Sequence, residues 1–397
     1  MKILHTSDWH VGKVLKGASR ADEHAAVLAE LVEITRAEAP DLVIVAGDLF
    51  DTAAPTPAAT RLVTGALTAL RGTGAEVVAI AGNHDNGAAL DALRPWADAA
   101  GIVLRGTVRR AEDHLITGET SGGERWRLVA LPFLSQRYAV RATEMFELSA
   151  AEATQTYADH LSRLLAALTA GFASDDHVNL ITTHLTVVGA TTGGGEREAH
   201  TILAYAVPAT IFPASAHYVA LGHLHRAQTV PGPAPVRYSG SPLAVDFGEG
   251  GELSQQLAAG SGGAGEPSSS VTIVEVAADR AARTREVPVT AALPLRTVRG
   301  TLAELAELTP GDAWLRVFVR EQPRAGLREE VQDLLPRALE VRIDPELLPA
   351  GGGGGQVAAR AGRSPSELFA EYLNVRGHDD APVQALFEEL YDEVVSG

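Results

Sequence analysis

Five short apolar runs in this chain each lead directly into polar residues that can bind metal ions, and this pattern constrains the fold more than any other feature. The runs have the length and β-branched content of buried strands, and helix-like stretches separate several of them. This alternation predicts an α/β fold. Ligands gather at the carboxyl ends of strands in open α/β sheets, so we expect one shared site. The residues are Asp8, His10, Asp48, Asp51, Asn83, His84, Asp85, His184, His223 and His225.

These residue types suit a pair of divalent cations. The chain has no cysteine, so disulfides and thiolate ligands are excluded, and oxygen or imidazole nitrogen must hold any metal. Two cations about 3.5–4 Å apart can neutralise a phosphodiester and activate water, and one carboxylate has to bridge them. Asp48 is the candidate bridge. Gly47, Gly82 and Gly222 precede candidate ligands, and we expect them to let the backbone turn sharply there.

Taken together and in order, these segments resemble the metallophosphoesterase, or calcineurin-like, superfamily over residues 1 to about 245. A single Gly-Asp or Gly-Asn pair after a strand is usually only a turn, whereas the full ordered set is specific. The resemblance implies a two-sheet β-sandwich flanked by helices rather than a simple doubly wound sheet. The matching segments are Asp8-Trp9-His10, Gly47-Asp48-Leu49-Phe50-Asp51, Gly82-Asn83-His84-Asp85, His184 and Gly222-His223-Leu224-His225.

The resemblance also implies roles for individual residues. His84 would stabilise the transition state or protonate the leaving oxygen, Asp85 would orient His84, and Asp51 would support the metal shell. The family favours manganese, with magnesium or zinc as alternatives. One metal would be held by Asp8, His10, Asp48 and His225, and the other by Asp48, Asn83, His184 and His223.

Residues 5–12, 220–228, 238–243 and 246–249 are similar to the SbcD nuclease branch of this superfamily. That branch implies 3′→5′ exonuclease action on duplex DNA and endonuclease action on single strands and hairpins, in recombination and double-strand-break repair. It also implies a homodimer formed through the nuclease domain and a partner ATPase of the SbcC type. The chain has no P-loop, so the partner would hydrolyse ATP. Arg226 and Arg237 are candidate contacts for backbone phosphates.

Composition divides the chain into five parts. Residues 363–397 carry two arginines against eight carboxylates, and their apolar residues have helical spacing, which suits a protein groove better than DNA. Five glycines in a row mark a tether before this segment. The expected parts are a nuclease domain at 1–247, a flexible linker at 248–270, an α+β DNA-capping domain at 271–345, a tether at 346–362, and an ATPase-binding helical pair at 363–397.

The formal net charge of −17 argues against tight binding to DNA by this chain alone. We therefore expect weak DNA affinity that depends on the metals and on the partner. No apolar run approaches the ~20 residues that span a bilayer, and no signal peptide is evident, so we expect a cytoplasmic protein that is nucleoid-associated when on DNA. Two alternatives are a small-molecule phosphodiesterase that acts on nucleotides or cyclic nucleotides and a non-enzymatic metal-bound scaffold for the ATPase. The intact His84 argues against the scaffold.

Overall fold

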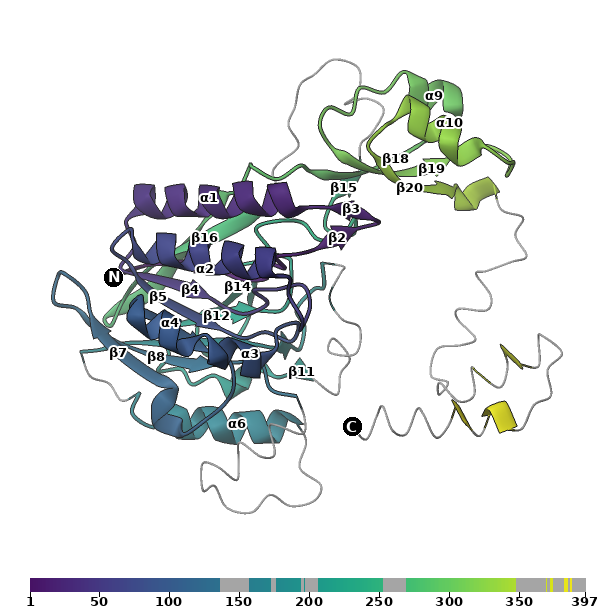
Figure 1. Ribbon diagram of the computed structural model, residues 1–397. Coiled ribbons are helices and arrows are strands. Elements are labelled where there is room, and N and C mark those ends of the chain that lie inside the picture. The colour runs from purple at the N-terminus through teal and green to yellow at the C-terminus, as the bar shows by residue number, and fades with distance from the viewer. Residues whose placement is uncertain are drawn as a thin grey trace.

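Two six-stranded sheets packed face to face form the body of the molecule (Figure 1). The computed structural model describes residues 1–135, 157–172, 176–193, 196, 206–252, 269–347 and scattered residues between 369 and 387. Helices α1 (Ala21–Glu38) and α2 (Pro57–Arg71) cover the outer face of one sheet, and α6 (Tyr157–Leu168) covers the other. This layered arrangement confirms the predicted two-sheet sandwich flanked by helices.

The first sheet has the strand order β17-β16-β1-β4-β5-β6. Strands β1 (Lys2–Thr6), β4 (Leu42–Val45), β5 (Glu76–Ile80) and β6 (Ile102–Arg105) are parallel. Layers cover both faces of the sheet, which explains why β4 is a continuous apolar run rather than an alternating one. Val43 and Val45 face the helices, while Leu42 and Ile44 face the second sheet.

The second sheet has the order β13-β14-β12-β9-β8-β7. Its inner strands β8 (Arg125–Leu131), β9 (Val178–His184), β12 (Tyr218–Gly222) and β14 (Val236–Tyr238) are parallel. The edge strands β7 (Leu115–Glu119) and β13 (Gln228–Val230) are antiparallel to their neighbours. Both sheets therefore have several parallel strands whose carboxyl ends are available to build a site.

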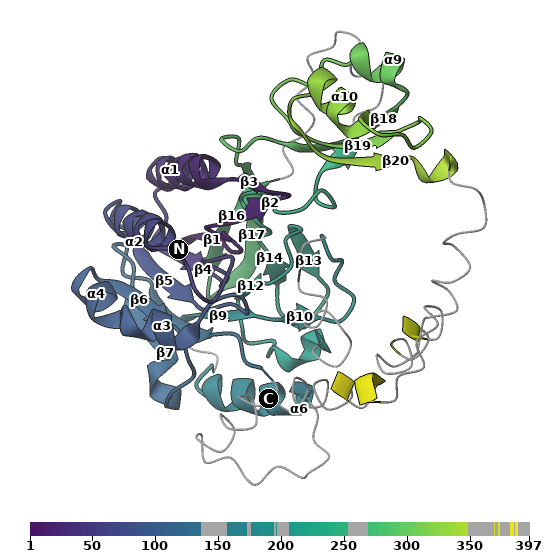
Figure 2. The same cartoon turned by 45° about the vertical axis from the view of Figure 1, so that its right-hand side comes forward.

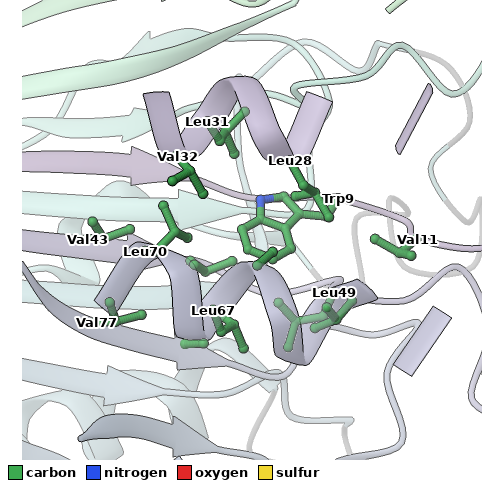
Figure 3. Close-up of a cluster of buried hydrophobic side chains, with 14 of the residues drawn as sticks. Trp9, Val11, Leu28, Leu31, Val32, Val43, Leu49, Leu67, Leu70 and Val77 are labelled. Carbon is green, nitrogen blue, oxygen red and sulfur yellow. The ribbon is translucent and has the colours of Figure 1, made fainter. Parts of the chain in front are cut away.

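Trp9 occupies the centre of the layer between the first sheet and its helices (Figure 3). Its side chain is buried among Leu28 and Leu31 of α1, Leu67 of α2 and Leu49, and its indole nitrogen donates a hydrogen bond to Thr6. Packing at this position joins the loop after β1 to both helices. The same loop carries Asp8 and His10, so the core fixes the backbone of two candidate ligands.

The residues expected to open the capping domain at 271 lie in the first sheet instead. They form β16 (Ser270–Ala277), which pairs with β1, and β17 (Arg280–Pro288) pairs with β16. The physical reason is that β16 is buried on both faces and completes an otherwise open edge of the sandwich, which no local pattern could reveal. The small module therefore starts after residue 288.

The small module is a four-stranded sheet with two helices. Its strand order is β15-β18-β19-β20, and all three pairings are parallel. Its elements are β15 (Gly251–Glu252), β18 (Leu295–Gly300), α9 (Leu302–Ala306), β19 (Trp314–Val319), α10 (Leu327–Leu334) and β20 (Ala338–Ile343).

A buried ion pair joins the module to the sandwich. Arg20 binds Glu23 at 2.6 Å and also donates to the carbonyl of Ala244. Glu23 in turn accepts hydrogen bonds from the indole of Trp314 in β19, at 2.9 Å, and from the amide of Leu293, also at 2.9 Å. Figure 2 shows the module above the end of the sandwich where β2 (Val14–Leu15) and β3 (Ala18–Ser19) lie. These contacts hold the module next to the loops that follow β1 and β14.

The remaining elements are short. The predicted linker lies outside the described residues from 253 to 268, as do 348–362 of the predicted tether and most of the C-terminal segment. Within the described part of the chain, no helix combines the length and apolar character needed to cross a bilayer.

The short elements are α3 (Gly87–Ala92), α4 (Arg94–Ala99), β10 (Thr186–Val187), β11 (Ala206–Val207) and the 3₁₀ turns Ala111–Asp113, Ala209–Ile211 and Pro345–Leu347.

Candidate dimetal centre

All seven predicted metal ligands lie together at one edge of the sandwich, and all seven are buried. They follow, or end, the strands β1, β4, β5, β9 and β12. These strands are parallel within each sheet, so their carboxyl ends meet at this edge. The ligands are Asp8, His10, Asp48, Asn83, His184, His223 and His225.

One group of donor atoms comes from Asp8, His10 and His225, whose potential ligand atoms lie within 4.8 Å of one another. The Nε2 atoms of the two histidines are 3.1 Å apart. Ligand atoms bound to one cation at about 2.1 Å are separated by about 3 Å, so this spacing fits a shared metal.

A second group forms around Asn83. Its Oδ1 lies 2.9 Å from Nε2 of His184 and 2.8 Å from Nδ1 of His223. The Oδ2 atom of Asp48 lies 3.4 Å from Nε2 of His184 and 3.7 Å from Nε2 of His10. Asp48 therefore stands between the two groups, as a bridging carboxylate must.

Four of the ligand residues have backbone conformations that side chains rarely adopt. Their φ angles are +55° at Asp8, +47° at His10, +51° at Asp48 and +104° at His223. Each such residue costs on the order of 1–3 kcal/mol, and strain of this kind clusters at functional sites. Here the strain turns successive side chains inward to the same point, which supports a site that is built for ligands.

The three glycines beside the ligands are required for different reasons. Gly47 has φ +95°, the turn that the sequence predicted. Gly82 and Gly222 are required for space instead. A Cβ on Gly82 would lie 2.2 Å from Oδ1 of Asp48, and one on Gly222 would lie 1.9 Å from the carbonyl oxygen of Ala46. The loops are thus packed directly against each other around the site.

The electrostatic field of the site favours cations. Burial alone would lower the pKa of His184, but the Asp48 carboxylate outweighs burial and raises this pKa to about 9. Burial would likewise lower the pKa of His225, but the charge of Glu249 and its hydrogen bond raise it to about 10. Burial and the charge of Asp48 raise the pKa of Asp85 to about 7. Divalent cations would replace the extra proton that His184 and His225 each bind, so the donor set and the field both fit two metal ions.

His84 lies next to the donor groups and is held by the backbone of a neighbouring loop. Its amide donates to Oδ1 of Asp48 at 2.8 Å, and its Nδ1 lies 2.8 Å from the carbonyl oxygen of Asp51. Its ring meets the ring of His10 edge to face, with centroids 4.7 Å apart. Since a carbonyl only accepts, Nδ1 carries the hydrogen, and Nε2 is the ring atom that can exchange a proton with a substrate.

The two acidic residues near His84 contact different groups. The Asp85 carboxylate accepts from the amides of Leu49, Phe50 and Gly82 at 2.9–3.1 Å, so it fixes two ligand loops. The contact that orients the His84 ring is instead the carbonyl of Asp51. The Asp51 side chain lies 3.5 Å from Nδ1 of His10 and 3.1 Å from Lys13, so it contacts a candidate ligand.

Three further residues complete the site and were given no role from the sequence. Ser7 donates to Oδ2 of Asp8 at 2.5 Å, and Glu196 accepts from the amide of His225 at 3.2 Å. Glu249 lies 2.9 Å from Nδ1 of His225. Glu249 belongs to the 246–249 segment that matches the SbcD branch, which was the only signal for it. Arg237, a candidate phosphate contact, is instead buried and bound to Thr272, Thr229 and Glu286.

Two family models and several known proteins match this chain. Residues 1–227 match the family model of the calcineurin-like phosphoesterases, and residues 292–377 match the model described as the type 5 capsule protein repressor C-terminal domain. The chain is 35% identical over 341 residues to the SbcD subunit of the SbcCD nuclease of Bacillus subtilis, covering 83% of this chain and 81% of the relative. It is 37% identical to the protein of the same name in Escherichia coli K12, covering 64% and 63%. A solved dimetal phosphatase from Danio rerio is 14% identical, with a TM-score of 0.39 over 73% of this chain and 99% of that one.

Proposed function

The chain belongs to the calcineurin-like phosphoesterases and, within them, to the SbcD nuclease subunits, and from this premise we propose that it hydrolyses DNA phosphodiester bonds with two metal ions. The proposed activities are 3′→5′ exonuclease action on duplex DNA and endonuclease action on single strands and hairpins, in double-strand-break repair and recombination. One observation carries the proposal. Two groups of buried donor atoms meet at Asp48, with His84 held beside them.

The ions, proposed to be manganese, would supply positive charge for the phosphate oxygens and an activated water. The first would be held by Asp8, His10, Asp48 and His225, and the second by Asp48, Asn83, His184 and His223.

The protein's own residues carry out the remaining steps. His84 is proposed as the general acid. Its protonated Nε2 gives a proton to the leaving oxygen while the Asp51 carbonyl holds Nδ1.

The other parts of the chain are proposed to supply binding surfaces. The module at 289–347 would position duplex DNA over the metals. The described residues between 369 and 387 are helical, Phe369 stacks on Phe387 with ring centroids 4.1 Å apart, and Tyr372 and Leu386 are more than half exposed. Exposed aromatic and aliphatic side chains of this kind suit a protein groove. We propose that this segment binds an SbcC-type ATPase and that the complex works in the cytoplasm on nucleoid DNA.

The homodimer is proposed to form through the nuclease domain. Phe50, Pro55, Leu90 and Leu93 line a mostly apolar cavity of about 210 Å³ beside α2 and α3. Phe50 in this lining directly precedes Asp51 in the chain. A second copy bound in the cavity would therefore lie close to the loops that carry the candidate ligands. Association at this face would place two metal centres near each other on one duplex.

The test compares wild-type protein with His84→Gln and with the control His177→Gln. His177 precedes β9 at the opposite edge of the sheet from the site. Each variant is given manganese, and cleavage of an end-labelled duplex and of a small chromogenic phosphodiester is measured alongside metal content. We expect His84→Gln to keep both metals and to lose DNA cleavage by about 10²–10⁴-fold, and the control to retain it.

Two results would contradict the proposal. Cleavage of the small diester without any cutting of DNA, even with the ATPase present, would indicate a nucleotide phosphodiesterase. A metal-loaded protein that cleaves neither substrate would indicate a scaffold for the ATPase.

A further inference from the structure

Glu249 is a buried carboxylate next to one metal ligand. Its side chain is 7% exposed, one oxygen lies 2.9 Å from Nδ1 of His225, and the other accepts from the amide of Val245 at 3.1 Å. A buried carboxylate is costly unless it has partners, and Glu249 has two. No step of the proposed reaction uses this residue directly, so its burial requires another reason.

The contact with His225 determines how that imidazole can bind a metal. A carboxylate accepts hydrogen bonds, so Nδ1 carries the hydrogen, and Nε2 presents its lone pair toward Nε2 of His10, 3.1 Å away. In the second donor group the partner is weaker, because Nδ1 of His184 donates to the neutral carbonyl of Ala46 at 2.8 Å. A metal held by His225 would therefore have a histidine ligand that donates to a charged carboxylate. A metal held by His184 would have a histidine ligand that donates to a neutral carbonyl.

Glu249 also lies next to the small module in the chain. Gly250 follows it, and β15 begins at Gly251, whose residues pair with Arg296 and Thr297 of β18. A Cβ on Gly250 would lie 2.3 Å from the carbonyl oxygen of Leu295, so these two backbones are in direct contact. One residue thus separates the partner of a metal ligand from an edge strand of the module.

The same loop has two more contacts with the module. Phe247 is buried with Leu295 in one apolar cluster, and the guanidinium of Arg316 lies 4.8 Å from the Phe247 ring centroid. Asp246 forms an ion pair with Arg316 at 3.9 Å. Any displacement of the module would therefore move the loop that carries Glu249.

We propose that Glu249 is a positioning residue that holds His225 for the metal shared with Asp8 and His10, and that it couples occupancy of this metal to the small module. The inference rests on the proposed two-metal function. If docking of the module stabilises the position in which Glu249 contacts His225, it also raises the affinity for the metal. By linkage, binding of the metal then stabilises docking of the module by the same free energy.

The first experiment measures manganese binding to the full chain, with no DNA present. Glu249→Ala removes the acceptor of His225, whereas Glu249→Gln keeps an oxygen acceptor at the same reach without the charge. Glu275→Gln is the control, because Glu275 is an exposed carboxylate of β16 that lies opposite Lys2, at the end of β1 away from the ligands. Binding is followed by metal analysis and by electron paramagnetic resonance, which distinguishes an exchange-coupled manganese pair from a single ion.

We expect wild type and the control to bind two ions and to show the coupled spectrum. Glu249→Ala should lose about 10–100-fold in affinity at one site only and show a single-ion spectrum at low manganese, and Glu249→Gln should restore part of the loss. Wild-type affinity and spectrum in Glu249→Ala would overturn the positioning role. If the alanine variant does not fold, an unchanged affinity in Glu249→Gln is the overturning result.

The second experiment tests the coupling by hydrogen exchange. Manganese should slow amide exchange in peptides that cover β18 in wild type, and this protection should be lost in Glu249→Ala. Equal protection in both proteins would overturn the coupling. Neither measurement requires nuclease activity, so a chain that cuts no DNA but loses one ion in Glu249→Ala would refute only the proposed function.

Discussion

Replacing Gly82 by alanine should displace the bridging carboxylate while leaving the rest of the fold intact. Gly82 has an ordinary φ, so alanine is permitted by the backbone itself, and the only obstacle is space. The new Cβ would lie 2.2 Å from Oδ1 of Asp48 and 2.3 Å from its amide nitrogen. The amide nitrogen belongs to the backbone, so a rotation of the Asp48 side chain cannot remove this contact.

The size of the effect follows from these distances. Contacts of a Cβ below 3.0 Å essentially do not occur, so Asp48 must move by at least 0.8 Å relative to residue 82. Catalytic geometry has to be held within about 0.5 Å, and a displacement near 1 Å costs about 100-fold in rate. We therefore expect Gly82→Ala to lower turnover by about 100-fold, or about 2.7 kcal/mol of transition-state stabilisation, and to weaken manganese binding.

Gly65→Ala is the matched control. Gly65 lies inside α2, and no neighbouring atom lies within 4 Å of the point that an added methyl group would occupy. The variant should gain about 0.5–1 kcal/mol of stability because alanine favours the helix. The assay measures metal content, hydrolysis of a chromogenic phosphodiester and urea unfolding of both variants. A Gly82→Ala protein with unchanged metal content and turnover would show that the Asp48 position is not critical, which would refute the reasoning.

Two further predictions concern stability. Trp9→Ala should lower the free energy of unfolding by about 3–5 kcal/mol in urea titrations, because it leaves a cavity between α1, α2 and the first sheet; a loss below about 1 kcal/mol would contradict this packing. Burial lowers the pKa of His5 to about 3 and that of His24 to about 4, so the unfolded chain binds protons that the folded chain does not. Stability should thus be lost as pH falls from about 6.5 toward about 4, by about 1.4 kcal/mol per pH unit for each histidine. Urea unfolding at pH 7 and pH 5 measures this loss. His24→Gln should reduce the dependence of the unfolding free energy on pH by the contribution of one histidine. An unchanged dependence would contradict the lowered pKa of His24.

That the candidate metal ligands meet at one edge of the sandwich could be predicted from the sequence, because each residue is encoded locally. His184 ends a strand, and Asp48 and Asn83 follow strands by a few residues, so the local pattern and the parallel pairing together determine where they meet. Helix α1 is likewise encoded locally, because apolar residues recur at helical spacing between 22 and 38 and a proline follows at position 40.

What could not be predicted depends on contacts between distant parts of the chain. The partner of β16 is β1, about 270 residues earlier, and only the open edge of the first sheet selects it. The carboxylate of Asp85 binds three backbone amides, which have no signature in side-chain types. Glu249 acquires its role only when the loop after β14 is folded back onto His225.

The structure also accounts for how so acidic a chain could act on DNA. Several arginines of the small module already have acidic partners: Arg316 binds Glu340 at 2.7 Å, Arg320 binds Asp344 at 3.1 Å, and Arg337 binds Asp312 at 3.1 Å. Paired guanidinium groups project little positive field, so the module by itself offers weak attraction to phosphates. Two divalent cations would add about four positive charges at one point, next to the bond to be cut. On this argument the metals select the phosphate for hydrolysis, and the affinity for the duplex as a whole has to come from the proposed ATPase partner.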